Sequence, residues 1–370
     1  MHPTGPVAQR FPLIPRIRPA CLPLDARVGR LCELADTGSQ RQDPSLASTV
    51  FNQTALLASD LGLPDYARAL CHRHAGLYLT LGPLPAMSAI RGLEPLVNLA
   101  RLHLRAGRHD QGHRLLLDLY HAVTAGTATV LDGITVPADL TETDQQRTEV
   151  RTWLWRVVLA DGTRALTAAG RWTEALRHIE NHRGIGQRIL DGRQVAVLAR
   201  ATTGDTAGAL SLLETTEPGD PWEGAVTAVL TALLHPEHQP TTTTAIDHVL
   251  ALEPGKGLAV FTTRLTLSAI DAADQGTSTA ARDLAAALIS RTLDPPDGYA
   301  ARELLAHPAC RTLLTATQGR GLSDALTACG LGDRRLPTTT RTRLRQALAL
   351  ATDVLRKTPL DQEPQPAGRS

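Results

Sequence analysis

The chain has 370 residues, of which 42% are hydrophobic and 3% aromatic, and its formal net charge is +1. This balance gives no sign of the strong positive field typical of nucleic-acid or membrane-surface binding, and the hydrophobic content is too high for a wholly disordered chain. Many alanines and leucines with few aromatics favour helices over β-sheet. The five scattered cysteines form no CxxC pair, which is typical of reduced thiols in a cytosolic protein.

Residues 1–44 form a Pro/Arg-rich lead-in, which we expect to be mostly extended, with a short helix at 26–36, and to lie along the first helices. Its prolines interrupt any continuous apolar region of the kind found in a signal peptide. No stretch reaches the roughly 18 uncharged apolar residues that a membrane-spanning helix needs. We therefore expect a cytoplasmic protein without a membrane partner.

From residue 45 onward, apolar residues recur at helical spacing, and glycine or proline separates the segments. Asp43 can cap the first helix, with Pro44 in its first turn. The pattern predicts about seven helical hairpins, with helices at 44–61 and 65–80, 87–106 and 109–124, 149–169 and 172–183, 187–203 and 205–216, 222–234 and 245–252, 258–274 and 278–291, and 299–317 and 322–329. Pro308 should kink or split the helix at 299–317, and the four threonines at 241–244 should lie in a loop.

An insertion at 125–147 interrupts this rhythm. Residues with high β-propensity flank Asp132-Gly133, which predicts a short β-hairpin, and Thr141 can cap the next helix. Insertions in repeat arrays often lie on the binding face, although a surface ornament is the commoner outcome. Trp153 and Trp155 follow at once; they either anchor the insertion or stack on a ligand.

One stretch repeats itself closely. Gly170, Trp172, Ala175 and Ile179 stand 34 residues before Gly204, Thr206, Ala209 and Leu213. The pattern Gly-x-Trp-x-x-Ala-x-x-x-Ile resembles the core of the tetratricopeptide repeat, in which a glycine ends the first helix and a small residue lets the second pack closely. The same five-residue spacing joins Gly62 to Ala67, Gly107 to Gly112 and Gly276 to Ala281, so the resemblance covers about 45–330.

The resemblance implies an all-α, right-handed α–α superhelix (a solenoid) with a small β-hairpin-like insertion. It also implies a concave groove, lined by first-helix side chains, that binds an extended peptide or protein segment. Amides can pair with both polar groups of a peptide backbone, and arginine can fork onto a carboxylate. Counting back from the turn glycines, the implied groove residues are Asn52, Gln53, Asn98, Arg101, Arg105, Asp161, Arg164, Asp191 and Gln194. These residue types are also ordinary on polar helix surfaces.

The sequence shows no phosphate-binding loop, dinucleotide-binding glycine motif, zinc-protease motif or nucleophile elbow. We therefore expect no cofactor and no catalytic residues. The pairs His109/His113 and His178/His182 have i,i+4 spacing that a metal could bridge, but no third ligand is assigned, so we expect no metal site. The leading hypothesis is a non-catalytic scaffold, adaptor or regulatory partner. The alternative is an all-α enzyme or biosynthetic accessory protein with a pocket of dispersed residues such as Asp161, Arg164, Asp191 and Arg193.

The end of the chain should be a capping helix within 331–358 and a disordered tail at 359–370. The helix at 341–356 carries Arg341, Arg343, Arg345 and Arg356. These arginines are either a solvated face or a phosphate-binding face.

Overall fold

The computed structural model describes residues 1–235, 238–253, 255–273 and 278–357. Apart from one two-stranded antiparallel hairpin, the regular structure of these residues is helical, which confirms the all-α prediction. No described helix combines the length and apolar character needed to cross a membrane. All five cysteines are free thiols.

Two compact units make up the chain, and each joins segments that are distant in sequence. The first unit contains Asp25–Ala165 and the residues from Gly332 onward, and the second contains Met1–Leu24 and Leu166–Leu331. Each unit has its own cluster of buried apolar side chains. The chain therefore leaves one unit and enters the other at Leu24, within helix α8, and at Leu331.

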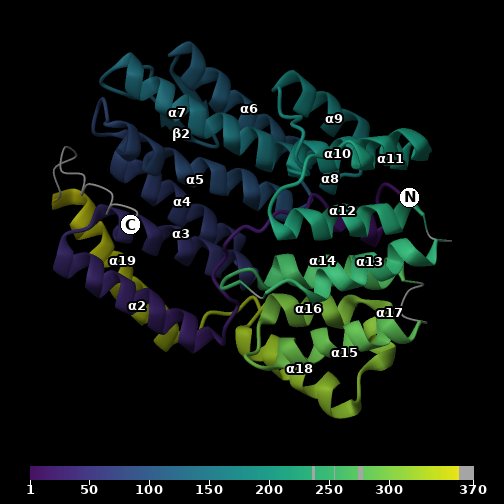
Figure 1. Cartoon of the computed structure of the whole chain (residues 1–370). Coiled ribbons are helices and arrows are strands. Elements are labelled where there is room, and N and C mark those ends of the chain that lie inside the picture. Colours follow the sequence, from purple (N-terminus) through teal and green to yellow (C-terminus); the bar gives the residue numbers. More distant parts are fainter. Residues whose placement is uncertain (236–237, 254, 274–277, 358–370) are drawn as a thin grey trace. The chain divides into compact units, whose positions relative to one another are not determined.

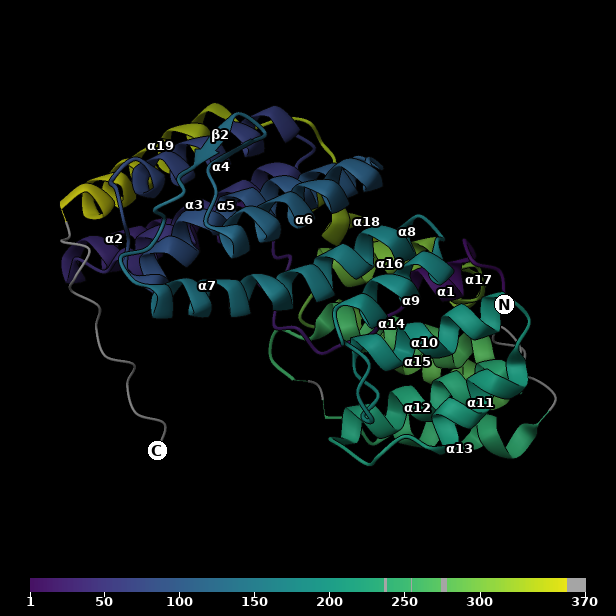
Figure 2. The same cartoon turned by 90° about the horizontal axis from the view of Figure 1, so that it is seen from above.

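The first unit is a stack of helices in which neighbours in sequence pack together (Figure 1). Helix α3 packs on α4, α4 on α5, α5 on α6, and α7 on both α5 and α6. The last helix, α19, lies against α3 and α4, as the second view also shows (Figure 2). The elements are α2 (Leu24–Arg41), α3 (Pro44–Asp60), α4 (Pro64–Leu79), α5 (Ala86–Arg105), α6 (His109–Ala125), β1 (Thr129–Leu131), β2 (Ile134–Val136), α7 (Asp144–Val157), the π-helical turn η1 (Val158–Gly162) and α19 (Thr338–Lys357).

The second unit repeats this arrangement with shorter helices. Helix α10 packs on α9 and α11, α12 on α13, and α14 on α15 and α16. The boundary between the units falls inside α8 (Thr163–Ala168). The other elements are α1 (Pro6–Arg10), α9 (Trp172–Asn181), α10 (Asp191–Thr202), α11 (Thr206–Glu214), α12 (Pro221–Leu234), α13 (Gln239–Leu250), α14 (Ala259–Ala272), α15 (Thr279–Leu293), α16 (Gly298–Ala306), α17 (Pro308–Leu313) and α18 (Ala316–Cys329).

The small residues of the repeat pattern lie where paired helices approach most closely. The alanines at these positions are 0% exposed in every hairpin that carries one, namely Ala67, Ala175, Ala209, Ala245 and Ala281. At Gly112 the approach is closer still, because a Cβ there would lie 2.8 Å from the Ala100 carbonyl oxygen. The turn glycines Gly62, Gly107, Gly170 and Gly204 have φ between 73° and 89°, the left-handed conformation that ends a helix. Gly276 lies outside the described residues.

The predicted hairpin is confirmed. Thr129 pairs with Val136 and Leu131 with Ile134, and both turn residues, Asp132 and Gly133, have positive φ. A two-residue turn of this kind matches the twist of the strands it joins. Leu131, Ile134 and Val136 are buried in the core of the first unit, and Trp153 packs against that core from α7.

Several predicted details are wrong. Thr143, not Thr141, caps α7: its hydroxyl accepts from Gln146 N–H, and the Gln146 side chain accepts in return. The four threonines at 241–244 belong to α13, where the Thr244 hydroxyl donates to the Pro240 carbonyl. The helix expected at 149–169 begins at Asp144 and is interrupted by η1. The helix expected at 26–36 is longer, since α2 spans Leu24–Arg41. The prediction for Pro308 is confirmed, because this residue begins a separate helix, α17, after α16.

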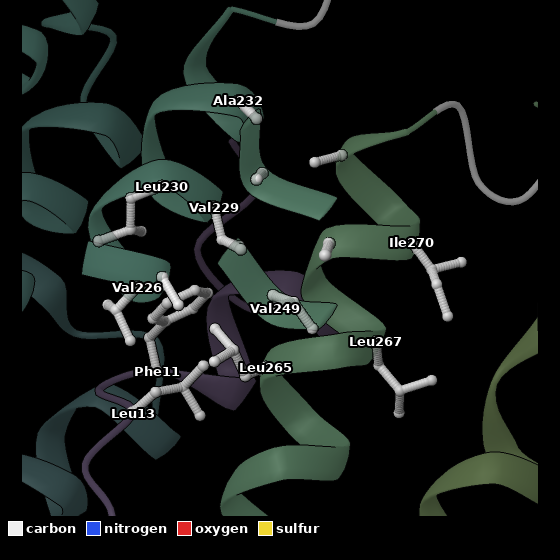
Figure 3. Packing of buried hydrophobic residues seen from close by; sticks show 14 of the residues in the cluster. Phe11, Leu13, Val226, Val229, Leu230, Ala232, Val249, Leu265, Leu267 and Ile270 are labelled. Carbon is white, nitrogen blue, oxygen red and sulfur yellow. The ribbon is translucent and has the colours of Figure 1, made fainter. Parts of the chain in front are cut away.

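Residues 1–24 pack with the later helices of the chain, whereas the sequence suggested that they lie along the first ones. Figure 3 shows Phe11 and Leu13 beside Val226 of α12 and Leu265 of α14 in one apolar cluster. Phe11 and Leu13 are each 3% exposed. The Trp172 indole N–H donates to the Pro3 carbonyl at 2.8 Å. The residues after the short helix α1 are extended, as their prolines predicted.

The apolar face of α19 is buried in the core of the first unit through Leu344, Ala347, Leu348 and Ala351. The terminal helix therefore covers α3 and α4. The tail predicted to be disordered, 359–370, lies outside the described residues.

Candidate functional site

Two of the predicted groove residues, Gln194 and Asp191 on α10, contact an extended peptide segment, and that segment belongs to the chain itself. The Gln194 side chain accepts from Leu13 N–H at 2.7 Å and donates to the Leu13 carbonyl at 2.9 Å. It also donates to the Ile189 carbonyl and is 0% exposed. Three residues along the segment, Arg16 pairs with Asp191 at 2.8 Å. One face of α10 thus binds an extended backbone and a basic side chain.

In the first unit, four other predicted residues come together in one polar chain. Arg101 on α5 donates two hydrogen bonds to the Asp161 carboxylate of η1 in a bidentate arrangement, with Nη2–Oδ2 at 2.8 Å and Nε–Oδ1 at 3.3 Å. Arg101 also donates to Asn98 Oδ1 at 3.1 Å, and Asn98 donates to Asn52 Oδ1 at 3.0 Å. Asn52 on α3 then donates to Glu94 Oε2 at 2.7 Å. We call these five residues the α3–α5–η1 network.

The two ends of the network fix the orientation of its amides. Arginine can only donate hydrogen bonds, so the Asn98 oxygen must face Arg101 and the Asn98 nitrogen must face Asn52. A carboxylate can only accept, so the Asn52 nitrogen faces Glu94. The side chains are therefore held in place by charged groups at both ends, which is the arrangement that a preorganised binding surface requires.

Glu94 was not among the predicted residues. It is half-buried on α5, and burial raises the pKa of its carboxyl above the ordinary range, against the opposing effects of Asn52, Arg91 and Arg101. A carboxyl with a raised pKa beside a set of polar side chains is typical of functional sites. A repeat comparison could have found it, because Glu94 precedes Gly107 by 13 residues, as Asp191 precedes Gly204.

Breaks in helical regularity accompany the network. Asp161 lies on the π-helical turn η1 and is 3% exposed. Pro95, directly after Glu94, lies inside α5, where it cannot donate a backbone hydrogen bond to the preceding turn. π-helical turns are frequent at functional sites because the extra residue redirects side chains. Neither irregularity was expected from the hydrophobic period.

The other predicted residues of the first unit are Gln53, Arg105 and Arg164. Arg105 bonds Ser59 Oγ at 2.6 Å and lies 3.3 Å from Asp60, a carboxylate that also pairs with Arg27 at 2.6 Å. Gln53 is half-buried on α3, and Arg164 is exposed on α8. Arg193, a residue of the enzyme alternative, has a structural role: it is 7% exposed and donates to the Leu212 and Gly186 carbonyls.

The hairpin turn forms a second polar cluster. Asp132 Oδ1 accepts from Arg68, and Asp132 Oδ2 lies 3.9 Å from His103 Nε2 beside a cavity of about 240 Å³. Burial, with the charge of Arg108, lowers the pKa of His103 despite the attraction of Asp132. His103 Nδ1 and Asp132 Oδ2 have no hydrogen-bond partner among the described residues. The insertion thus brings an aspartate beside a histidine and an arginine from two helices.

The two histidine pairs have the i,i+4 spacing that a metal ion could bridge. The rings of His178 and His182 lie 4.6 Å apart, and His182 Nδ1 contacts the His178 carbonyl at 2.8 Å. Within the described ranges, no group of three or more His, Cys, Asp or Glu side chains is placed to hold a metal ion. Comparison of the chain with protein-family models, with curated proteins and with solved structures finds no significant match.

Proposed function

We propose that this chain is a non-catalytic helical-repeat interaction protein of the tetratricopeptide type, a right-handed α–α superhelix that binds an extended peptide or protein segment. It serves as a scaffold, adaptor or regulatory partner in the cytoplasm. The binding surface is the α3–α5–η1 network. The main support is that the network contains an amide and a carboxylate, the same side-chain groups with which α10 binds residues 13–16 of the same chain.

The two sets of residues correspond in repeat position. Gln194 precedes its turn glycine by ten residues, and Asn52 precedes Gly62 by ten. Asp191 and Glu94 each precede their turn glycine by 13. On α10 the amide binds a peptide backbone and the carboxylate binds an arginine. We infer that in the first unit Asn52 and Glu94 act in the same way on a segment supplied by a partner.

The network has hydrogen-bonding capacity left for such a segment. Arg101 is 49% exposed, and its guanidinium has two N–H groups beyond the three that bond Asp161 and Asn98. Asn98 keeps one amide hydrogen beyond the one that bonds Asn52. These donors suit carbonyl groups of an extended backbone, and Glu94 suits a basic side chain. A partner segment with Lys or Arg is therefore expected.

The test is a display selection of random extended peptides on the full-length protein, followed by fluorescence anisotropy with the enriched sequences. We expect enrichment of peptides that carry a basic residue. Asn52→Ala, Asn98→Ala and Glu94→Gln should each weaken binding about tenfold or more, equivalent to ~1.4 kcal/mol. Asp118→Ala is the matched control, because Asp118 is exposed on α6, the second helix of the hairpin that carries Asn98.

The melting temperature of each variant separates loss of binding from loss of folding. Selection of no peptide class, or binding that all three variants retain, would overturn the proposal. Selection of acidic peptides would contradict the role given to Glu94.

A further inference from the structure

A cavity of about 720 Å³ lies in the first unit, where the chain enters α19. It is bounded by the start of α4, by residues 333–337 and by the first turns of α19. The volume is within the usual range for small-molecule sites. None of the α3–α5–η1 network residues lines it.

Positive charge dominates the cavity wall. Four arginines line it, Arg334, Arg335, Arg341 and Arg345, against the single carboxylate of Asp333. None of these arginines forms an ion pair with a carboxylate of the described residues. Arg341 and Arg345 stand one helical turn apart on α19, where like charges repel. An anion in the cavity would offset this repulsion.

The helix itself favours an anion at the same place. Helix α19 begins at Thr338, which lines the cavity, and has no acidic residue in its first turn. The N–H groups of that turn carry the positive end of the helix dipole, which attracts phosphate groups and disfavours nearby cations. Arginines at this end of a helix therefore oppose its stability unless a negative ligand balances them.

The segment that leads to α19 is fixed to the end of α3. Gly332 N–H donates to the Asp60 carbonyl at 2.8 Å and Arg334 N–H to the Leu61 carbonyl at 2.7 Å. Arg334 has φ 57°, a left-handed conformation that costs on the order of 1 kcal/mol for a residue with a side chain. Residues held in this way gather at ligand sites, where the surrounding structure maintains the strain.

Tyr66 of α4 gives the cavity an aromatic side. Its ring is half-buried, and burial raises the pKa of its hydroxyl, although Arg345, Arg73 and Arg341 act in the opposite direction. Arg341 and Arg345 line the same cavity as this ring. Leu63, Leu336 and Pro337 complete an apolar wall beside it. A ligand with both a planar ring and an anionic group fits such a lining.

We propose that this cavity binds a small organic phosphate that carries a planar ring, the chemical class of the nucleotides. Arg341, Arg345 and the first N–H groups of α19 bind the phosphate. Tyr66 packs against the ring. This site is independent of the peptide-binding function proposed above.

The experiment is isothermal titration calorimetry of the full-length protein with ADP, pyrophosphate and adenosine as probes. We expect ADP to bind more tightly than pyrophosphate and adenosine not to bind measurably. The double variant Arg341→Gln/Arg345→Gln should weaken ADP binding at least tenfold. Tyr66→Leu should weaken ADP binding but leave pyrophosphate binding unchanged.

Arg356→Gln is the matched control, because it removes an exposed arginine from the other end of the same helix. It should bind ADP as the wild type does. In the absence of ligand, the double variant should melt at a higher temperature than the wild type, because it removes unbalanced repulsion. ADP binding that the double variant retains, equal affinity for ADP and pyrophosphate, or no measurable binding of ADP to the wild type would overturn the proposal.

Discussion

Gln194 on α10 binds both polar groups of the Leu13 backbone, so the first residues of the chain are held in the second unit by a side-chain amide. Gln194 is completely buried, and the Ile189 carbonyl takes its remaining amide hydrogen. A buried side chain with this bonding fixes the register of an extended segment, because a slip by one residue would leave its partners unpaired.

We predict that Gln194→Leu lowers the free energy of unfolding by about 2–4 kcal/mol, because the N–H and C=O of Leu13 and the Ile189 carbonyl lose their buried partner. Urea unfolding followed by circular dichroism measures the change. Hydrogen exchange at residues 11–18 should rise in the variant. Gln187→Leu, at an exposed position of the same unit, should change stability by less than ~0.5 kcal/mol. An unchanged exchange rate at Leu13 would contradict the assigned bonding.

Two glycine substitutions in the first unit should have opposite signs. Gly112→Ala places a Cβ 2.8 Å from the Ala100 carbonyl oxygen, and we expect a loss of about 1–3 kcal/mol despite the better helix propensity of alanine. Gly76→Ala meets no atom within 4 Å on α4 and should stabilise the protein by roughly 0.5–1 kcal/mol. Thermal unfolding of both variants tests this difference. Stabilisation by both would show that the helices can separate at Gly112 without cost.

His74 makes the first unit sensitive to acid. Its ring is 1% exposed and stacks on Phe51 at 5.0 Å, and burial lowers its pKa to about 3. The unfolded chain takes up a proton near pH ~6.5, whereas the folded chain does not until about pH 3. Stability is therefore expected to fall as pH decreases through this window, by a total on the order of 5 kcal/mol.

His74→Phe removes the titrating group and keeps an aromatic ring beside Phe51. We expect the slope of stability against pH to flatten between pH ~6.5 and ~3 in this variant. Urea unfolding at several pH values measures it. His121→Phe, which replaces an exposed ring on α6, should leave the wild-type slope. If His74→Phe keeps the full slope, another group is responsible for the acid sensitivity.

Asp271 on α14 anchors Arg10 of the N-terminal segment. Arg10 Nη1 lies 2.5 Å from Asp271 Oδ2, and His307 Nε2 lies 3.1 Å from Oδ1. Burial alone would raise the pKa of Asp271, but His307 and Arg10 outweigh it and hold the pKa below its usual value. The stability from this lowered pKa is present above the unfolded pKa of ~3.9 and is lost as pH falls through the folded value.

Asp271→Asn should therefore lower the free energy of unfolding by about 3–5 kcal/mol at pH 7, since it leaves Arg10 buried without a counter-charge. The variant should also lose less stability than the wild type when pH falls below ~4. Denaturant titrations at pH 7 and pH 3 measure both effects. Asp283→Asn, at an exposed position of α15, serves as the control and should be neutral. If Asp271→Asn and Asp283→Asn lower the free energy of unfolding equally at pH 7, Asp271 does not anchor Arg10.

The spacing of apolar residues and the turn glycines were enough to place most helices, because both signals are local in sequence. The apolar spacing marks the face that a helix buries, and a glycine in the left-handed conformation marks where the helix ends. The turn at Asp132-Gly133 was predictable for the same reason. The π-helical turn at Asp161 and the burial of Phe11 and Leu13 were not, since they depend on contacts between residues far apart in sequence. Asn52, Asn98, Arg101 and Asp161 were identified from repeat position. Glu94 stands at the repeat position of Asp191 and was missed, and its bond to Asn52 became visible only in the structure.

The exchange of terminal segments between the units has a consequence for biosynthesis. Residues Met1–Leu24 of the second unit are made before Asp25–Ala165 of the first unit, whereas the rest of the second unit, Leu166–Leu331, is made after it. The first unit lacks α19 until Thr338–Lys357 have been made. Vectorial synthesis ordinarily lets an N-terminal domain fold before the rest appears. Here Phe11 and Leu13 lack their partners on α12 and α14 until those helices have been made, and the first unit stays incomplete until α19 has followed the second unit.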